Sequence, residues 1–322
     1  MQFTKRWFLI VLVVGLIILA AIIHIFHQPT TAVRIGYQRT LLYLPIFVAD
    51  ERGFFEEEGL KVKLERFNSA NLMIQALLSR QIDVTGMSAL NVLATVENEE
   101  PGQFKMFLFE VFTKKEHADH ILVPVDSSVN DLSDLKGKRI GVHPGTTIKM
   151  YATMSLRQFL DTEKDVEFVE LAPSLQVQAI ASKQVDALFA LEPVSAIAIS
   201  KGYARDLGGF IAQHTIDPAY PGASVFSSDF IDEKKELAEK VQQAVYSAVD
   251  FIRENPGEAK KVLARYLGLE EEILPNLKLI GWVKTNEVDT SAIQQLLNIY
   301  AEHRIVDKIE LPSNAYFKSS GE

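Results

Sequence analysis

The residues of this chain that best suit ligand chemistry stand directly after predicted strands. His143-Pro144-Gly145-Thr146-Thr147 follows one such strand and opens a helix. Glycine lets the backbone approach a ligand closely, and the first N–H groups of a helix are free to bind an anion. We therefore predict that Gly145, Thr146 and Thr147 contact a polar or anionic solute. The alternative is a glycine turn in which a threonine only caps the helix.

Five other residues occupy comparable positions after strands. Tyr43 can stack on a ring or donate its hydroxyl, or it can simply pack beside the helix that follows. Ser69 can cap the next helix and hold an anion at the same place. Ser88 is similarly placed, with Met87 as an apolar wall. Glu192 suits a cationic or amino-bearing ligand, although a glutamate at a helix start also suits the helix dipole.

Composition and charge exclude several classes of function. The chain has 322 residues, a net charge of −9 and no cysteine. The negative charge argues against nucleic acid as a partner, because phosphate binding needs a basic surface. Without cysteine there is no disulfide, thiol nucleophile, thiolate metal site or lipidated cysteine. The sequence also has no phosphate loop, catalytic-triad context or metal-ligand spacing, so we expect no enzyme activity, no cofactor and no metal.

Two stretches of the chain resemble each other and indicate an internal duplication. Residues 74–84 (IQALLSRQIDV) match residues 177–187 (VQAIASKQVDA), and Arg-Ile-Gly occurs at both 34–36 and 139–141. The nearly equal spacing of the two matches favours two copies of one unit; chance similarity between helix-to-strand turns is the alternative. Asp83 and Asp186 hold equivalent places and are predicted to accept backbone hydrogen bonds, which is a structural role.

Each copy has the pattern strand–helix–strand–helix–strand. Hydrophobic periodicity, prolines at helix starts and glycines after helix ends place these elements. The predicted strands are 33–37, 61–67, 83–85, 139–143, 166–171, 186–190 and 223–227, and the predicted helices are 45–52, 70–79, 146–160, 174–182, 232–254, 256–267 and 291–303. Strands that alternate with helices favour mostly parallel sheets, with ligands beyond the carboxyl ends of the strands.

These elements predict two α/β lobes with a cleft between them. The first lobe is discontinuous (33–112 and 216–310), the second is 118–210, and 311–322 is a polar tail. The chain is expected to cross between the lobes near 112–120 and 208–215. Two crossing segments make a hinge, which lets the lobes close on a small-molecule solute.

The N-terminal segment decides the compartment. Lys5 and Arg6 precede an apolar run over residues 7–26, and about 20 residues at about 1.5 Å each span a bilayer core. We predict a transmembrane anchor at 7–26, a cytoplasmic segment at 1–6 and a main domain outside the membrane, periplasmic or extracellular. A cleaved signal peptide is the alternative, although this run is long and ends in bulky residues. Both interpretations export the domain.

Four segments in order along the chain carry a family resemblance: residues 45–60, 81–84, 132–142 and 185–193. With them the chain resembles the nitrate/sulfonate/taurine group of ABC-transporter substrate-binding proteins, which includes thiamine-pyrimidine relatives. The resemblance implies an α/β, two-lobe periplasmic-binding-protein (type II) fold without catalysis. It also implies capture of a small organic or anionic solute for a membrane permease and its ATPase. A membrane-tethered sensing module that acts through a partner membrane protein is the alternative.

Overall fold

The structure is a computed structural model that describes residues 32–319. The predicted cytoplasmic segment at 1–6 and the predicted transmembrane anchor at 7–26 lie outside these residues. Within 32–319, none of the helices combines the length and the apolar character needed to cross a membrane.

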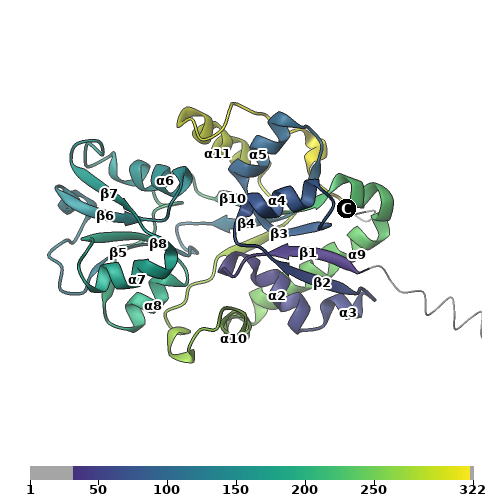
Figure 1. Ribbon diagram of the computed structural model, residues 1–322, viewed down its shortest axis with the longest axis horizontal. Helices are drawn as coiled ribbons and strands as arrows, with labels where there is room; N and C mark the ends of the chain where they lie inside the picture. The colour runs from purple at the N-terminus through teal and green to yellow at the C-terminus, as the bar shows by residue number, and fades with distance from the viewer. Residues whose placement is uncertain (1–31, 320–322) are drawn as a thin grey trace, which may run out of the picture. The chain divides into compact units, whose positions relative to one another are not determined.

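The first lobe is built on a six-stranded sheet with the order β11-β4-β10-β3-β1-β2, and Figure 1 shows helices on both of its sides. Because both faces are covered, the central strands are almost wholly apolar; β4 has the sequence FKMFLFEVF and is buried from its third residue onward. The strands are β1 (Val33–Tyr37), β2 (Val62–Arg66), β3 (Val84–Ala89), β4 (Phe104–Phe112), β10 (Ala219–Ser227) and β11 (Gly281–Lys284).

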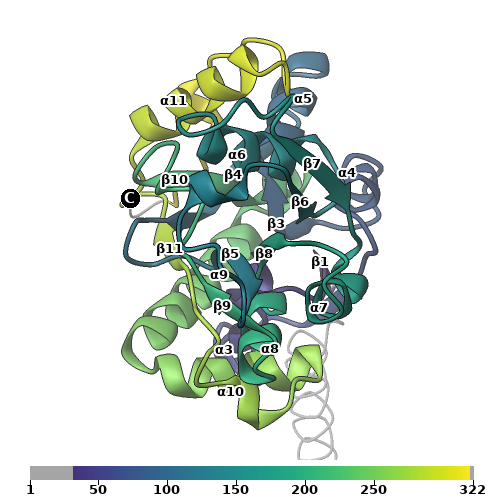
Figure 2. The same cartoon turned by 90° about the vertical axis from the view of Figure 1, so that its left-hand side faces the viewer.

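The second lobe is built on a five-stranded sheet with the order β7-β6-β8-β5-β9. Figure 2 faces this lobe and shows α6 on one side of the sheet, with α7 and α8 on the other. Its strands are β5 (Asp119–Pro124), β6 (Lys138–Val142), β7 (Val166–Glu170), β8 (Ala187–Leu191) and β9 (Ala204–Asp206).

The prediction of mostly parallel sheets is wrong outside the duplicated units. Within each unit the strands pair in parallel: β1 with β2 and β3, and β6 with β7 and β8. In contrast, β10 pairs antiparallel with β3 and β4, and β5 pairs antiparallel with β8 and β9. Both β5 and β10 enter their sheet from the other lobe, so they run against the strands of the unit that they join.

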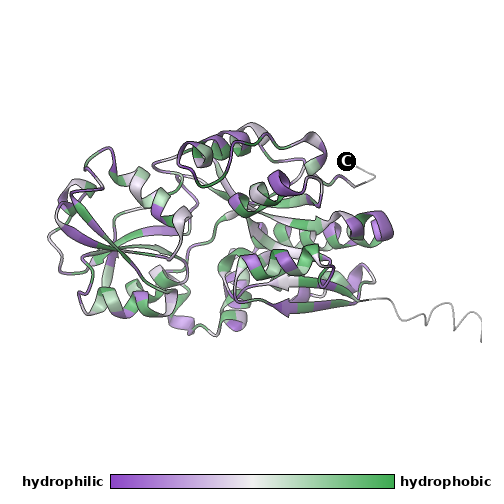
Figure 3. Cartoon of the chain, turned by 45° about the horizontal axis from the view of Figure 1, so that its top comes forward, coloured by the Kyte–Doolittle hydropathy of each residue, from purple (hydrophilic) through white to green (hydrophobic). Residues whose placement is uncertain are grey.

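Most predicted helices have ends within one residue of the predicted positions because local signals mark them. The helix predicted at 146–160 ends four residues early, the one predicted at 232–254 begins four residues early, and the helices Phe54–Glu57, Leu90–Glu99 and Val194–Ser200 were not predicted. α10 (Pro256–Leu267) begins with proline and ends at Gly268, which is left-handed. Figure 3 shows the strands mostly in the hydrophobic colour and the helices in both colours, as expected of helices with one buried face. The other helices are α2 (Leu44–Glu51), α3 (Phe54–Glu57), α4 (Ala70–Leu78), α5 (Leu90–Glu99), α6 (Thr146–Leu156), α7 (Pro173–Ala181), α8 (Val194–Ser200), α9 (Ser228–Glu254) and α11 (Thr290–Glu302).

The two units of the duplication share one hydrogen-bonded clamp. The backbone N–H of Arg34 donates to Asp83 Oδ2 at 2.8 Å, and the N–H of Asp83 donates to the carbonyl of Arg34 at 2.9 Å. The same two bonds join Arg139 and Asp186 at 2.9 and 2.8 Å. The predicted structural role of the two aspartates is therefore confirmed, with the donor on the first strand of each unit.

Two segments carry the chain between the sheets. β4 ends at Phe112 and β5 begins at Asp119, and β9 ends at Asp206 before β10 begins at Ala219. Both passages overlap the segments predicted to cross. A third segment, between α10 and β11, touches the second lobe without joining its sheet: Asn276 Nδ2 donates to Ser200 Oγ at 2.9 Å.

Candidate functional site

A cavity of about 540 Å³ lies between the two sheets and is lined by both lobes. The segments that follow β1, β3, β6, β7 and β8 all reach it, so the carboxyl ends of the strands of both units open into one space. Much of its wall is apolar, including Leu41, Val92, Phe112 and Ile211. Its volume is in the range of pockets that enclose small organic molecules.

One wall of the cavity is the start of α6. Gly145 is the N-cap residue, with φ of +116°, and no side chain caps the helix. Only glycine adopts this backbone conformation readily, so the turn from β6 into α6 depends on it. Thr146 and Thr147 form the first helical positions, and both line the cavity. Their hydroxyls and the uncapped N–H groups make this wall attractive to an anionic or polar group.

The opposite wall contains a buried glutamate. Glu110 is 4% exposed and lines the cavity, and its Oε2 has no hydrogen-bond partner among residues 32–319. Burial raises the pKa of its carboxyl to about 8. The hydroxyl of Thr40, which also lines the cavity, is buried without a partner as well. Buried polar atoms are normally paired, so these two unpaired atoms beside the cavity are unusual.

A tyrosine pair joins the lobes across the cavity. Tyr151 on α6 and Tyr300 on α11 both line it, and their hydroxyls are 2.7 Å apart. α6 flanks the second sheet and α11 packs on β10 of the first, so this bond holds the lobes in a closed arrangement. Both rings are buried, and burial raises both hydroxyl pKa values. The pair therefore stays protonated at physiological pH.

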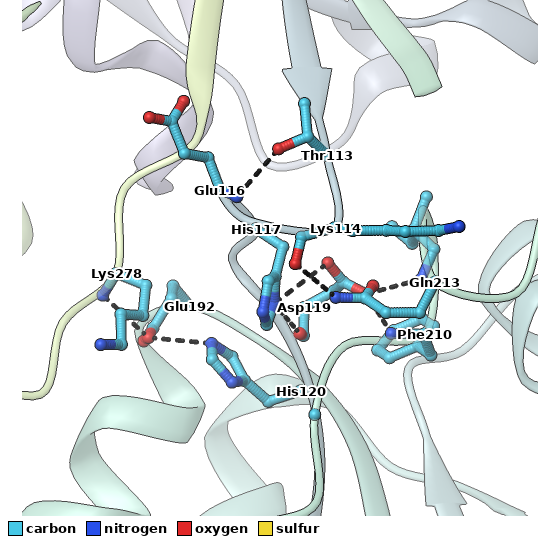
Figure 4. Close-up of polar contacts among 12 residues, drawn as sticks. Thr113, Lys114, Glu116, His117, Asp119, His120, Glu192, Phe210, Gln213 and Lys278 are labelled. Carbon is cyan, nitrogen blue, oxygen red and sulfur yellow. Dashed lines mark hydrogen bonds and ion pairs between the residues drawn. The ribbon is translucent and has the colours of Figure 1, made fainter. Parts of the chain in front are cut away.

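Glu192 belongs to a network at the hinge, which Figure 4 shows. Its Oε2 accepts the N–H of Ala196 at 3.1 Å, and its Oε1 accepts the N–H of Lys278 at 3.1 Å. His120 Nε2 lies 3.4 Å from Oε1, and His120 Nδ1 is 2.8 Å from Asp206 Oδ2. Both carboxylate oxygens of Glu192 are thus engaged by the protein.

His120 is charged within this network. Burial lowers the pKa of a histidine, but the hydrogen bond to Asp206 and the nearby carboxylate of Glu192 outweigh it and raise the pKa of His120 to about 9. Lys278 lies on the segment that leads back to the first sheet, whereas His120 and Glu192 belong to the second lobe. The network therefore ties the lobes together beside the cavity.

The predicted ligand residues divide into two groups. Gly145, Thr146, Thr147 and Glu192 line the cavity. Among these four, Thr146 stands at the first helical position and does not act as the N-cap, which is the alternative stated above. Glu192 faces the cavity from the hinge with its carboxylate already occupied.

The structure does not bring the other four predicted residues to the cavity lining. The hydroxyl of Tyr43 donates to the carbonyl of Met87 at 2.8 Å, and both side chains are buried in the first lobe. Ser88 is also buried, and its hydroxyl donates to Thr85 at 3.0 Å. Ser69 caps α4 by accepting the N–H of Leu72 at 3.3 Å.

Sequence reasoning missed Glu110 and Thr40. The sequence did hold a clue to Glu110. It is the only acidic residue in the run FKMFLFEVF, and a charge is unexpected in a strand that is covered on both faces. Thr40 has no such signal. It belongs to the loop after β1, and only the backbone path of that loop turns its hydroxyl inward.

Another, wider groove of about 740 Å³ lies on the first lobe alone, between the start of α11 and residues 310–318. Within residues 32–319, none of the buried polar atoms without a partner belongs to its lining. The same part of the chain holds no group of three or more His, Cys, Asp or Glu side chains arranged to bind a metal. The interlobe cavity is therefore the better ligand site.

Comparison with known families assigns the chain to a family. Residues 42–259 match the family model described as NMT1/THI5 like. The chain belongs to this family. It is 26% identical over 281 residues to a putative aliphatic sulfonates-binding protein of Bacillus subtilis (strain 168), a match that covers 82% of this chain and 81% of the relative.

Solved structures show the same fold. The periplasmic aliphatic sulphonate binding protein SsuA from Escherichia coli superposes with a TM-score of 0.73 at 18% identity, covering 91% of this chain and 94% of that one. Enzymes also match: the 4-amino-5-hydroxymethyl-2-methylpyrimidine phosphate synthase of Aspergillus parasiticus is 25% identical over 238 residues, 70% of this chain and 67% of the enzyme. The predicted two-lobe fold and the predicted kinship with solute-binding proteins are confirmed.

Proposed function

We propose that this chain captures a small solute in the interlobe cavity and presents it to an ABC permease and its ATPase. The observation that carries the proposal is the convergence of the strand ends of both units on one apolar cavity between the lobes. Such a cavity opens and closes when the lobes move about their two connecting segments. The Bacillus relative, which is named for aliphatic sulfonates, supports this reading.

The solute is a small organic or anionic molecule whose polar head lies at the start of α6. Gly145, Thr146 and Thr147 hold that head through hydroxyls and uncapped N–H groups. Sulfonates, nitrate-like anions and pyrimidine or amine-bearing heterocycles are the classes to test. The apolar wall opposite contacts the rest of the solute.

The chain binds its solute without transforming it. The match to the Bacillus binding protein covers 82% of this chain, and the matches to the pyrimidine synthases of Schizosaccharomyces pombe and Aspergillus parasiticus cover 33% and 70% of it. The sequence has no cysteine that could act as a nucleophile or redox group. Solute recovered after prolonged incubation with the full-length chain should be unchanged by mass spectrometry; a steady decline would establish an enzyme.

The binding domain lies outside the cytoplasmic membrane, tethered by residues 7–26. The basic Lys5 and Arg6 before the apolar run support this orientation. Protease added to intact cells or spheroplasts should then digest nearly the whole chain. Protection of the domain until the cells are lysed would contradict the proposed location.

A thermal-shift screen of the full-length chain tests the binding role. A solute at 100 times its Kd stabilises the folded state by about 2.7 kcal/mol. We expect a hit among alkanesulfonates, aminoalkanesulfonates, nitrate and aminopyrimidines. Thr146→Ala should weaken the hit and leave the melting temperature of the free protein unchanged, because the hydroxyl caps no helix. No hit anywhere in the panel would count against the proposed function.

A further inference from the structure

In the sheet of the first lobe, a glycine on one strand leaves space for the carboxyl group of a glutamate on the neighbouring strand. Glu110 on β4 pairs in register with Gly222 on β10 and with Trp282 on β11. A Cβ atom on residue 222 would stand 2.5 Å from Glu110 Oε1, so the carboxyl lies directly over the glycine. Any other residue at 222 would displace the carboxyl, which means that its position is set by the neighbouring strand.

The protein supplies no cation to this carboxyl. Among the described residues, no Lys, Arg or His forms an ion pair with it, and none lowers its pKa. The titratable groups that sense its charge are the hydroxyls of Tyr43, Tyr151 and Tyr300, all three held by other hydrogen bonds. The indole N–H of Trp282 also has no partner among residues 32–319. Glu110 is left without the partner that a buried carboxyl requires.

A purely structural role does not account for this arrangement. A buried polar atom without a hydrogen bond costs about 1–3 kcal/mol, and a charged one costs more. The glutamate Glu97 of the same lobe is equally buried at 5%, but its Oε2 accepts the N–H of Gly102 at 3.0 Å. Glu97 lies outside the cavity and Glu110 lines it. The unpaired carboxyl is therefore the one that a bound solute can reach.

We propose that Glu110 determines the specificity of the cavity and selects solutes that carry a basic nitrogen, an amine or an amidine-type ring nitrogen, on the part that faces the first lobe. This proposal rests on the proposed function, since it assigns a role within the same cavity. The acidic or polar head of the same solute lies at the start of α6. Tyr151 connects the two walls, because it stands one turn beyond Thr147 on α6 and also senses the charge of Glu110.

Binding of such a solute moves a proton. At pH 7 a carboxyl with a pKa of about 8 is mostly protonated. When a cationic amine enters, the O–H bond of Glu110 breaks, the proton passes to the buffer, and an N–H of the ammonium donates to the carboxylate. The charge of the solute thus replaces the proton that neutralised Glu110 in the empty cavity.

Calorimetry on the full-length chain with matched solutes tests this proposal. The pairs are 3-aminopropanesulfonate with propanesulfonate, and 4-aminopyrimidine with pyrimidine. We expect the wild-type chain to bind the amine-bearing member about 10-fold or more tightly than its partner, since a charge-assisted hydrogen bond discriminates by more than 1 kcal/mol. Titration with 3-aminopropanesulfonate, whose amine is already protonated, in buffers of different ionisation enthalpy should show that close to one proton is released at pH 7. The ring of 4-aminopyrimidine is mostly neutral at pH 7, so it takes up the proton of Glu110 and should release none to the buffer.

Two variants complete the design. Glu110→Gln keeps the shape of the side chain but cannot take a negative charge, so both the preference for the amine and the proton release should disappear. Glu97→Gln is the matched control, because it changes a glutamate of equal burial outside the cavity, and it should keep both.

Three results would overturn the proposal while leaving the proposed function intact: equal binding of both members of each pair, equal weakening of both by Glu110→Gln, or binding of 3-aminopropanesulfonate by the wild type without proton release. The last needs no variant, so it decides the matter even if Glu110→Gln does not fold. Failure of every solute to bind would instead remove the proposed function itself.

Discussion

The two units of the duplication share a scaffold and differ where they face the cavity. In each, an arginine on the first strand is clamped by an aspartate at the start of the third. Between the first strand and the first helix, the second unit has only residues 143–145, and the first turn of α6 faces the cavity. The first unit has residues 38–43 there, with a 3₁₀ turn at Leu41–Tyr43 and the hydroxyl of Tyr43 bonded inside the lobe.

This difference gives the cavity two unlike walls. The second lobe offers an uncapped helix start, which attracts negative charge. The first lobe offers Glu110 from β4, a strand that lies outside the duplicated unit. The two units thus have the same framework, but the longer loop of the first unit and the added strand β4 make the two binding surfaces unequal. Four pairs of measurements test this difference between the lobes.

The largest expected effect is on stability at high pH. The carboxyl of Glu110 has a pKa of about 8 in the folded chain against about 4.3 in an unfolded one. The folded state therefore binds the extra proton, and stability falls as pH rises from about 4.5 through about 8. Glu110→Gln removes this loss, so its stability relative to the wild type should increase by a few kcal/mol between pH 5 and pH 9, measured by urea unfolding. If the difference in the free energy of unfolding between Glu110→Gln and the wild type did not change with pH, the folded state would not raise the pKa of Glu110.

The pH dependence of wild-type stability does not isolate the effect of Glu110, because His120 contributes a second dependence of the same sign. Its pKa is about 9 in the folded chain and about 6.5 unfolded. The raised value stabilises the fold below about pH 6.5, and that contribution is lost as pH rises through 9. Only the difference between Glu110→Gln and wild type at each pH isolates Glu110.

The clamps should differ in energy although they share a geometry. The side chain of Asp83 is 9% exposed and that of Asp186 is 34% exposed. Removing one partner of a buried charged pair leaves the other uncompensated, and the cost falls as water reaches it. We expect Asp83→Ala to lower the free energy of unfolding by about 3 kcal/mol and Asp186→Ala by about 1 kcal/mol. Equal losses would mean that the two lobes are equivalent in this respect.

One hydroxyl in each unit has a different expected role: Ser69 stabilises a helix, and Thr147 binds the solute. Ser69 caps α4, so Ser69→Ala should lower stability by about 1 kcal/mol and leave solute affinity unchanged. Thr147 lines the cavity and caps nothing, so Thr147→Val should weaken affinity by about 5- to 10-fold, about 1 kcal/mol, with little change in melting temperature. Melting curves with and without solute measure both quantities. A reversal of the two effects would place the binding hydroxyl in the first lobe.

The smallest effect is expected at the tyrosine pair. Tyr300→Phe removes the hydroxyl that meets Tyr151 across the cavity and should speed solute release by about 2- to 5-fold, less than 1 kcal/mol. Stopped-flow displacement measures this rate. Tyr246→Phe, which alters a buried tyrosine bonded to the carbonyl of Phe107 in the first lobe, is the control and should leave the release rate unchanged. Unaltered release from Tyr300→Phe would show that this bond does not hold the lobes closed.

The framework could be predicted from the sequence because its signals are local. Strand β1 and helix α10 have the predicted bounds, set by periodicity and by Pro256 and Gly268. The repeated Arg and Asp positions revealed the duplication. Four strands were not predicted. β9 and β11 have only three and four residues, too few to show alternation, and the buried strands β4 and β5 show no regular alternation of apolar and polar residues.

The site could be predicted only in part. The glycine and threonines after β6 carry a recognisable pattern, and all three line the cavity. Tyr43 and Ser88 follow strands as well, but the added 3₁₀ turn and the antiparallel strand β10 cover them. Glu110 reaches the cavity because β10 places a glycine beside it. The local sequence therefore marks Glu110 as an unusual charge in a covered strand, but it does not show that the side chain reaches the cavity, because the glycine beside it is distant in sequence.

Hydrogen–deuterium exchange on the full-length chain, with and without the solute that gives the largest thermal shift, would show whether the solute binds between the lobes. Solute should protect amides at residues 145–151 of the second lobe and around Glu110 of the first, with none at the start of α4, where Ser69 caps the helix. Protection confined to residues 285–294 and 310–318, which line the wider groove, would contradict the account and move the binding site out of the interlobe cavity.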